Sequence, residues 1–224
     1  MGALDRSEAL LGADAMSRLD AAHVLVVGVG GVGSWCAEAL VRTGVGRITL
    51  MDDDLVAESN LNRQCPATVE TIGCPKVKAM AERLRAIRPD CDVRERYERF
   101  EKPETFRGID CLVDAIDSVD CKAQLILSAA AAKIPVFSSM GAALRTDPTK
   151  VRVTRFEKVE GDGLARALRQ QFRRRGEWPG RFTCVWSAEN PLPSGQRTGV
   201  KGSIMPVTAT FGMCLASEVI RCLV

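Results

Sequence analysis

The chain has 224 residues, enough for one well-formed hydrophobic core and marginal for two. Hydrophobic residues make up 46% and charged residues 26% of it, the ordinary balance of a globular domain, and no apolar run approaches the roughly 20 residues that a membrane span needs. The net charge is only +3, and the first twenty residues combine acidic side chains with no long apolar stretch, which argues against a secretory signal. We therefore expect a cytoplasmic protein without a membrane span.

The charges are unevenly placed along the chain. Residues 145–201 contain 13 Lys or Arg and 6 Asp or Glu, so this segment carries +7 and the remainder −4. A basic carboxy-terminal part beside an acidic part is compatible with a polyanionic substrate. The nine cysteines are scattered, and no pair has the CxxC spacing typical of a structural zinc site, so we expect reduced thiols that mostly serve as small core residues.

Strand-like and helix-like patterns alternate along the chain. The predicted strands and helices, in chain order, are a strand at 23–28, a helix at 33–44 ending at Gly44, a strand at 47–52, a helix at 76–89 stopped by Pro89, strands at 92–100 and 109–117, a helix at 121–134, a strand and loop at 135–143, a strand at 150–156, a basic helix and turn at 163–180 and an apolar helix at 205–224. A segment rich in Pro, Gly and Ser predicts a mobile loop near residues 190–203.

This alternation predicts an α/β fold of the Rossmann-like, doubly wound type, with a mostly parallel sheet flanked by helices. We expect a single domain over residues 1–224. Its nucleotide-binding part would span about 20–145, and a basic substrate-binding part about 145–224.

The first strand runs into a glycine-rich turn, "GVGGVGS", that opens a helix. In this setting the glycines let backbone amides approach phosphate oxygens at the helix N-terminus. The next strand ends at Asp52, 24 residues after Gly28, about where a ribose-binding carboxylate belongs. On these two features alone, a nicotinamide-dependent dehydrogenase is the commonest answer.

The next segment, "MDDDLVAESNLNRQ", changes the interpretation because it adds cationic and polar groups that a dehydrogenase does not need. Arg63 offers a fork of donors to phosphate oxygens, and Lys76, at the start of a helix, supplies a second positive charge. Asp117, at the tip of "VDAIDS", can hold a magnesium ion that neutralises phosphate charge. Together these groups can stabilise a triphosphate that is cut at its α-phosphate.

Each of these residues also has a plainer interpretation. Asp52, Asp53 and Asp54 could form a solvated acidic turn, and Lys76 could be a surface residue of its helix. Asp117 could cap the helix that begins at Val119. The order of all these residues after the glycine turn favours the nucleotide interpretation.

The segments "GVGGVGS", "DDDLVAESNLNRQ", "GCPKV" and "VDAIDS" resemble the adenylation core of the ubiquitin-activating-enzyme-like superfamily, which includes activators of the ThiF and MoeB type. The resemblance covers residues 24–120 and implies an enzyme that binds ATP and Mg²⁺ and joins AMP to a carboxylate. It implies that Asp52 holds the ribose, that Asp117 places magnesium, and that Arg6 reaches the site of the partner subunit in a homodimer. The residues that the resemblance and the sequence together assign to ATP are Gly28, Gly30, Gly31, Gly33, Asp52, Asp54, Asn60, Arg63, Gln64 and Lys76. Those that they assign to catalysis are Arg63, Lys76, Asp117 and Arg6.

Within the superfamily, "RSEALLG", "DAIDSVDCKAQLI", "GAALRTDPTKVRV" and "CVWSAENPL" closely resemble the tRNA threonylcarbamoyladenosine dehydratase branch, and with them the resemblance covers nearly the whole chain. That branch activates the threonyl carboxylate of a modified adenosine beside the tRNA anticodon. The resemblance implies an ATP-driven loss of water that closes a ring on the base, with a sulfur-relay protein as a possible partner. Intramolecular attack on the adenylated carboxylate needs no enzyme nucleophile, because effective molarities reach on the order of 10⁵ M in good geometry.

The basic segment predicted to be helical is a candidate surface for tRNA phosphates. Its candidate contacts are Arg169, Arg173, Arg174 and Arg175, with Arg166 and Arg181 nearby in the sequence. The alternative is that these arginines merely form a solvated helix face.

Three other functions compete with the dehydratase. An activator of a ubiquitin-like sulfur carrier belongs to the same superfamily, but such proteins usually carry two CxxC pairs, and this chain has none. A nicotinamide-dependent oxidoreductase would need a site for a hydride acceptor. A nucleotide-sensing module would bind ATP without turnover.

The carboxy-terminal loop lacks the cysteine that some members of the branch carry, and Cys184 is the nearest match to another family cysteine. Because ring closure needs no enzyme nucleophile, we predict that Cys184→Ala keeps most of the activity, measured as AMP release. A loss above about 100-fold, roughly 2.7 kcal/mol of transition-state stabilisation, would contradict this prediction.

Overall fold

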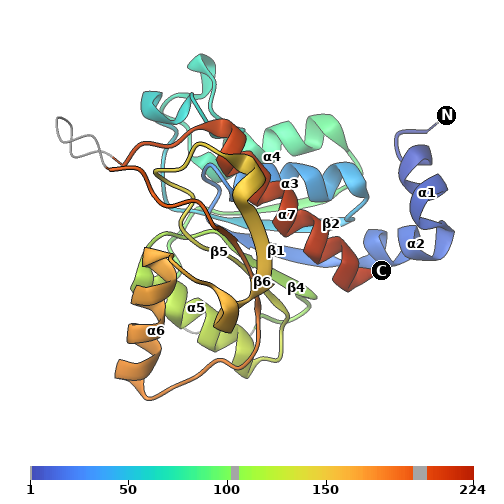
Figure 1. The fold of residues 1–224 in the computed structure, drawn as a ribbon. Helices are drawn as coiled ribbons and strands as arrows, with labels where there is room; N and C mark the ends of the chain where they lie inside the picture. The colour runs from blue at the N-terminus through green and yellow to red at the C-terminus, as the bar shows by residue number, and fades with distance from the viewer. Residues whose placement is uncertain (1, 102–105, 194–200) are drawn as a thin grey trace.

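A computed structural model of the chain describes residues 2–101, 106–193 and 201–224, so residues 194–200 of the predicted loop lie outside the described part. In the described part, the strands form one sheet in the order β3-β2-β1-β4-β5-β7-β6 (Figure 1). All neighbouring strands are parallel except β6 and β7, which are antiparallel. The predicted doubly wound α/β fold is therefore confirmed.

The strands are β1 (His23–Val27), β2 (Arg47–Met51), β3 (Asp92–Arg96), β4 (Cys111–Asp114), β5 (Val136–Ser139), β6 (Val151–Arg155) and β7 (Thr183–Ser187). The α-helices are α1 (Asp5–Leu11), α2 (Ala13–Ala21), α3 (Gly33–Thr43), α4 (Lys76–Ile87), α5 (Val119–Ala131), α6 (Gly163–Arg175) and α7 (Met205–Leu223). Short 3₁₀ helices lie at Glu58–Asn60, Val69–Thr71, Pro148–Lys150 and Phe156–Lys158.

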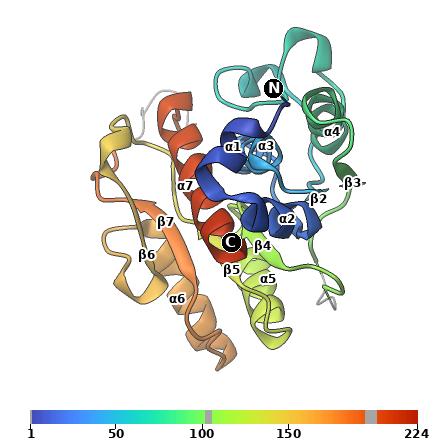
Figure 2. The ribbon, with the colours of Figure 1, turned by 90° about the vertical axis from the view of Figure 1, so that its right-hand side faces the viewer.

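Helices cover both faces of the sheet. Helices α3, α4 and α7 pack on one face, with α1 and α2 beside them, and α5 and α6 pack on the other (Figures 1 and 2). Successive residues of a strand point to opposite faces, so Val24 and Val26 of β1 enter the first core while Leu25 and Val27 enter the second. A strand that is buried on both sides reads as a continuous apolar run, which is why β1 was predictable from "HVLVV".

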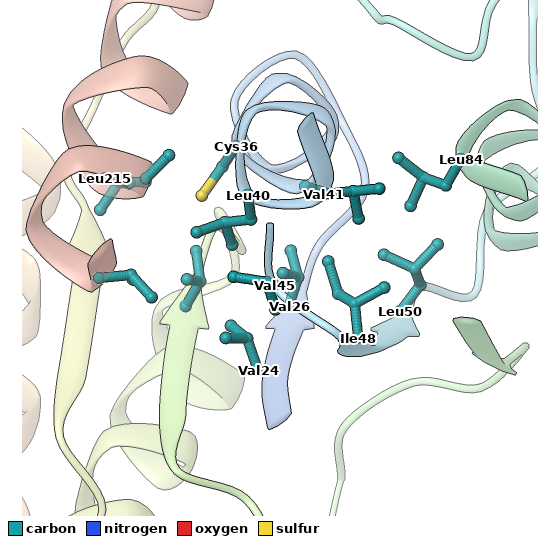
Figure 3. Packing of buried hydrophobic residues seen from close by; sticks show 14 of the residues in the cluster. Val24, Val26, Cys36, Leu40, Val41, Val45, Ile48, Leu50, Leu84 and Leu215 are labelled. Atoms are coloured by element: carbon teal, nitrogen blue, oxygen red, sulfur yellow. The ribbon is translucent and has the colours of Figure 1, made fainter. Parts of the chain in front are cut away.

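The core between the sheet and the first helix layer is closely packed. Figure 3 shows Leu40 and Val41 of α3 above Val24, Val26 and Ile48 of the sheet. Helix α7 approaches α3 so closely that a Cβ added at Gly212 would lie 2.6 Å from the carbonyl oxygen of Val32. By length and composition α7 could cross a membrane. In this fold, however, its apolar side is buried against α3 and the sheet.

Three elements were not predicted from the sequence. Helix α1 buries no residue, so its sequence shows no helical repeat of apolar residues. Helix α2 buries only Ala15, Met16 and Leu19, which is too few for a clear repeat. Strand β7 is short and follows a turn rich in Pro and Gly, and its pairing with β6 depends on residues more than 25 positions away. The third predicted strand is shorter than expected, because β3 ends at Arg96 rather than at Phe100.

A buried carboxylate joins α3 to α4 on this first layer. Glu38 accepts hydrogen bonds from Arg83, from the Cys65 thiol and from Arg42, at 2.6, 2.9 and 2.8 Å. Burial by itself raises the pKa of Glu38, but these three donors outweigh it and lower the pKa to about 2. The charged form of Glu38 is therefore favoured by the fold.

We predict that Glu38→Gln lowers the free energy of unfolding at pH 7 by about 1–3 kcal/mol, because charge-assisted hydrogen bonds are lost. The folded-state pKa of about 2 lies below the ordinary 4.5, so the contribution of Glu38 is complete above the ordinary value and is lost as the pH falls toward 2. Urea unfolding over this pH range measures both effects. Glu82→Gln, an exposed neighbour on α4, is the control, and equal pH profiles for the two variants would contradict the prediction.

Candidate active site

The predicted nucleotide-binding segments meet at one edge of the sheet. The glycine turn follows β1, the acidic segment follows β2, and "VDAIDS" includes the end of β4. In the sheet, β1 lies between β2 and β4. Because these three strands are parallel, their carboxyl ends share one edge (Figure 1). The connections of β1 and β4 go to opposite faces at this point, which is where open α/β sheets bind ligands.

The glycine turn is held against the loop that follows β4. Gly28 has φ of +90°, and a Cβ there would lie 2.7 Å from the carbonyl oxygen of Ala115. At Gly33 a Cβ would lie 1.9 Å from the carbonyl oxygen of Gly28. Glycine is therefore required at both positions, and the first turn of α3 is free to present its backbone amides.

Asp52 links the glycine turn to the acidic segment. Its Oδ2 accepts a hydrogen bond from the amide of Val29 at 2.6 Å, and its Oδ1 accepts one from the amide of Asp54 at 2.9 Å. Burial raises the pKa of Asp52, and the charge of Lys76 and these two amides act in the opposite direction. The carboxylate thus lies beside the turn, as a ribose-binding group would.

Lys76 is the first residue of α4, and its side chain is buried, so the interpretation of Lys76 as a surface residue is wrong. Its Nζ lies 2.6 Å from Oδ2 of Asp54, and its amide donates to the Asp54 carbonyl oxygen. The ion pair directs a cation toward the acidic segment instead of toward solvent.

Arg63, Asn60 and Gln64 lie together on the other side of the turn. The stem of Arg63 packs against Gly31, where an added Cβ would lie 3.3 Å from Cγ, and its guanidinium donates to the carbonyl oxygen of Ser59. The Oδ1 of Asn60 accepts from the amide of Ala57, so this side chain shapes its own loop. Gln64 is buried beside Gly30, and its Oε1 has no hydrogen-bond partner among the described residues.

Buried amide groups without a partner are uncommon, so Gln64 marks a place beside Gly30 where a hydrogen-bonding group of a ligand could be accommodated. The glycine turn itself is suited to phosphate oxygens, because its amides can be approached closely. This is the structural observation that supports the ATP assignment.

Asp117 lies in the loop between β4 and α5. It is exposed and makes no hydrogen bond or ion pair with the described residues, and the residue that caps α5 is Ser118. The interpretation of Asp117 as a helix cap is therefore wrong. Free carboxylate oxygens are donors that Mg²⁺ prefers, and Asp52, Asp53 and Asp54 bring further carboxylate oxygens within 4.8 Å of one another.

A buried ion pair that was not predicted from the sequence supports the Asp117 loop. Lys122 of α5 and Asp114 of β4 are both fully buried, with Nζ 2.8 Å from Oδ2. Nζ also donates to the carbonyl oxygen of Ile116 at 2.9 Å, and Ser138 donates to Asp114 at 2.6 Å. The sequence signal was Lys122, a cation in an otherwise mostly apolar helix that also contains Asp120, and composition alone does not show that this cation is buried.

Arg6 does not lie at this edge within its own chain. It is exposed on α1, and α1 and α2 lie at the side of the molecule where β1 begins, opposite the glycine turn (Figures 1 and 2).

The arginines of α6 fall into two groups. Arg169 lies over the Phe156 ring and donates to two backbone carbonyl oxygens, and Arg175 donates to Gln124 of α5, so both help to pack α6. Arg173 and Arg174 are exposed and make no side-chain bond with the described residues. Helix α6 begins at the same edge as the glycine turn, because its cap Asp162 accepts from the amide of Gly141, just beyond β5.

Cys184 is fully buried in β7. Burial raises the pKa of its thiol above the ordinary value, which disfavours the reactive thiolate.

Comparisons with known proteins agree with this geometry. The family model described as the ThiF family matches residues 4–224. The chain is 39% identical to the tRNA threonylcarbamoyladenosine dehydratase of Bacillus subtilis over 84% of this chain and 75% of that protein. It is 36% identical to the Escherichia coli protein of the same name, over 95% of this chain and 90% of that protein. Identity to the E. coli molybdopterin-synthase adenylyltransferase is 31%, over 94% of this chain and 76% of that protein.

Solved structures give the same result. The E. coli dehydratase in complex with AMP superposes with a TM-score of 0.90 at 38% identity, covering 98% of this chain and 93% of that chain. Its complex with ATP superposes with a TM-score of 0.89 and the same coverage.

We predict that Lys122→Met lowers the free energy of unfolding by about 3–5 kcal/mol, because it leaves the buried charge of Asp114 unpaired. The double variant Asp114→Asn with Lys122→Met should recover most of that loss, since no charge remains buried. Urea unfolding of the two single variants and the double variant forms a double-mutant cycle. Additive losses in the cycle would show that the pair is not coupled.

Proposed function

This chain belongs to the ThiF family, and we propose that it is an ATP-dependent dehydratase of tRNA. It adenylates the threonyl carboxylate of threonylcarbamoyladenosine and closes a ring on the modified base, with release of pyrophosphate and then AMP. The observation that carries the proposal is the glycine turn, with the unpartnered Gln64 beside it, at the edge of a sheet that superposes on a dehydratase bound to AMP.

The roles of the residues follow from their positions. The amides after Gly28 would bind phosphate oxygens, and Asp52, beside them, would accept from the ribose hydroxyls. Arg63 and Lys76 lie on either side of the turn, where their charges would stabilise the charge that builds up as the α-phosphate is attacked. Asp117 would hold Mg²⁺, and that ion would supply charge neutralisation of the phosphates.

The reaction can be written without an enzyme nucleophile. A carboxylate oxygen of the substrate bonds to the α-phosphorus, and the bond to pyrophosphate breaks. A second group of the same threonylcarbamoyl unit then attacks the activated carbonyl carbon, and AMP leaves with the oxygen that would otherwise be lost as water. The buried Cys184 takes no part in these steps.

The basic helix provides the surface for the tRNA. Helix α6 starts at the edge that carries the glycine turn, and its exposed arginines lie in its last turn, about 15 Å further along the helix. The phosphates of a tRNA whose modified base enters the site would extend along the helix to reach them. Arg173 and Arg174 are the free contacts, whereas Arg169 and Arg175 act mainly by fixing the helix.

We further propose that residues 1–224 work as one adenylation domain in the cytoplasm. Arg6 belongs to α1, which lies by the carboxyl end of α3 and away from its own glycine turn. This position supports a homodimer in which Arg6 completes the site of the partner subunit. A sulfur-relay protein is a possible additional partner.

The test of the proposed function is AMP release from ATP and Mg²⁺ by the purified protein. It is run with tRNA that carries threonylcarbamoyladenosine and with tRNA that lacks it, and the nucleosides are then analysed by mass spectrometry under mild conditions. We expect AMP only with the modified tRNA, together with the loss of one water from the nucleoside. ATP cleavage that is indifferent to tRNA, but dependent on a ubiquitin-like sulfur carrier, would favour the carrier activator instead.

We predict that Asp117→Ala lowers AMP formation by at least about 1,000-fold, because the phosphate charge is no longer neutralised in the transition state. The fold should be unaffected, since Asp117 makes no bond with the described residues. AMP release and urea unfolding measure the two effects. An active variant would remove Asp117 from the proposed magnesium site.

We predict that mixing Arg6→Ala protein with Asp117→Ala protein restores activity. Random pairing in a homodimer gives one intact site in half of the dimers, so about one quarter of wild-type activity is expected. The control mixture is Lys76→Ala with Asp117→Ala, whose two defects both lie in one chain's own site and should not complement. Failure of the first mixture in dimers shown to exchange subunits would refute the role of Arg6 in the partner's site.

A further inference from the structure

Trp178 lies just beyond the end of α6, in a turn whose backbone is fixed. The helix ends at Arg175, Gly176 takes the left-handed conformation with φ of +66°, and the amide of Glu177 donates to the carbonyl oxygen of Phe172. This is the usual way for a helix to end with its last carbonyl oxygens satisfied. Trp178 directly follows this hydrogen-bonded turn.

One side of the indole rests on buried aromatic rings. Its centroid lies 6.0 Å from that of Phe156 and 5.8 Å from that of Phe172, and Phe156 in turn stacks on Phe182. Both phenylalanines beneath it are fully buried, yet Trp178 itself is 52% exposed. The fold thus holds a large flat ring in one orientation with much of its surface open to solvent.

Three exposed arginines lie within five residues of Trp178 in the sequence. Arg173 and Arg174 lie in the last turn of α6, and Arg181 lies three residues after Trp178. All three side chains are exposed. None of the three forms an ion pair with the described residues, and Glu177 is the one acidic residue between positions 173 and 181. A flat aromatic surface among free guanidinium groups is the pattern by which proteins bind single-stranded nucleic acid.

We propose that Trp178 is a stacking platform for an unpaired base of the substrate tRNA, with Arg173 and Arg174 binding the adjoining phosphates. This proposal rests on the proposed function, because it identifies how the tRNA loop is held while its modified base occupies the adenylation site. Stacking on an aromatic ring does not distinguish one base from another, because every base has a flat aromatic face. One stacking site can therefore serve several tRNAs.

The position of the platform agrees with this role. Arg175, one turn before Trp178, donates to Gln124 of α5 at 2.6 Å. Gln124 stands seven residues after Asp117, a distance of about 10 Å along a helix. A tRNA loop whose modified base lies near Asp117 would extend past Gln124 and Arg175, by more than one nucleotide, to place an unpaired base on Trp178.

The charges favour RNA over a protein partner. A protein that covered the indole would also have to neutralise the free arginines around it, whereas the phosphates beside a stacked base do so directly.

Two substitutions at Trp178 test the stacking role. Trp178→Leu keeps an apolar side chain over Phe156 but removes the flat ring, and Trp178→Phe keeps a ring. We expect Trp178→Leu to raise KM for the modified tRNA about tenfold, with kcat and the affinity for ATP within about twofold of wild type, and Trp178→Phe to restore most of the loss. Urea unfolding identifies any variant that is merely unfolded.

A binding measurement that needs no turnover accompanies the kinetics. An unmodified tRNA transcript should quench the indole fluorescence of the wild-type protein, and the quench should shrink in Trp178→Phe, which retains Trp35 and Trp186. Replacing Arg173 and Arg174 by Ala should lower the salt dependence of log KM by roughly one per arginine.

The outcomes separate this proposal from the proposed function. If modified tRNA does not stimulate AMP release, the dehydratase function fails, while the quench still reports whether RNA stacks on Trp178. If AMP release depends on modified tRNA but Trp178→Leu has a wild-type KM and Trp178→Phe an unchanged quench, the stacking role is overturned.

Discussion

The edge of the sheet that carries the site depends on the buried pairing of Asp114 with Lys122. Two charges in the interior of a protein are tolerated only when they neutralise each other and their remaining bonds are satisfied, and here Ser138 and the carbonyl oxygen of Ile116 complete the set. Because Lys122 holds that carbonyl, the loop after β4 has a defined path. Gly28 packs directly on this loop, so the path of one loop sets the path of the other.

The same arrangement continues across the neighbouring strands. Asp52 accepts the amide that follows Gly28, its second oxygen orders the backbone at Asp54, and Asp54 holds Lys76. Each step is a short polar contact between a strand end and the next loop, and together they run from β4 through β1 and β2 to α4. In the proposed function, cations and amides would thereby be in position before any phosphate binds, which is the condition for effective electrostatic catalysis. The residues of the site are thus positioned by the fold and not by the ligand.

The parts of this arrangement that depend on local pattern could be predicted from the sequence. Continuous apolar strands, the glycine turn and the polar residues after it follow rules of short range, and parallel strands bring their ends together. Pairings between different elements could not be predicted, because a Lys within an apolar helix does not indicate that its partner is Asp114 on the preceding strand. Nor could the uses of the arginines in α6 be separated, since Arg169 over Phe156 and Arg173 in solvent look alike in the sequence. The antiparallel pairing of β6 with β7 was hidden for the same reason.

The pairing of β1 with β4 has a kinetic consequence. Val24 lies beside Cys111, so the two strands whose ends form the nucleotide site are joined by a closed loop of 87 positions. Pairings of such long range slow the folding of the whole domain, because the chain loses much conformational entropy before it gains their contacts. A nucleotide bound across the loops after β1 and β4, as proposed, would bind only the folded state and would therefore also stabilise the protein against unfolding.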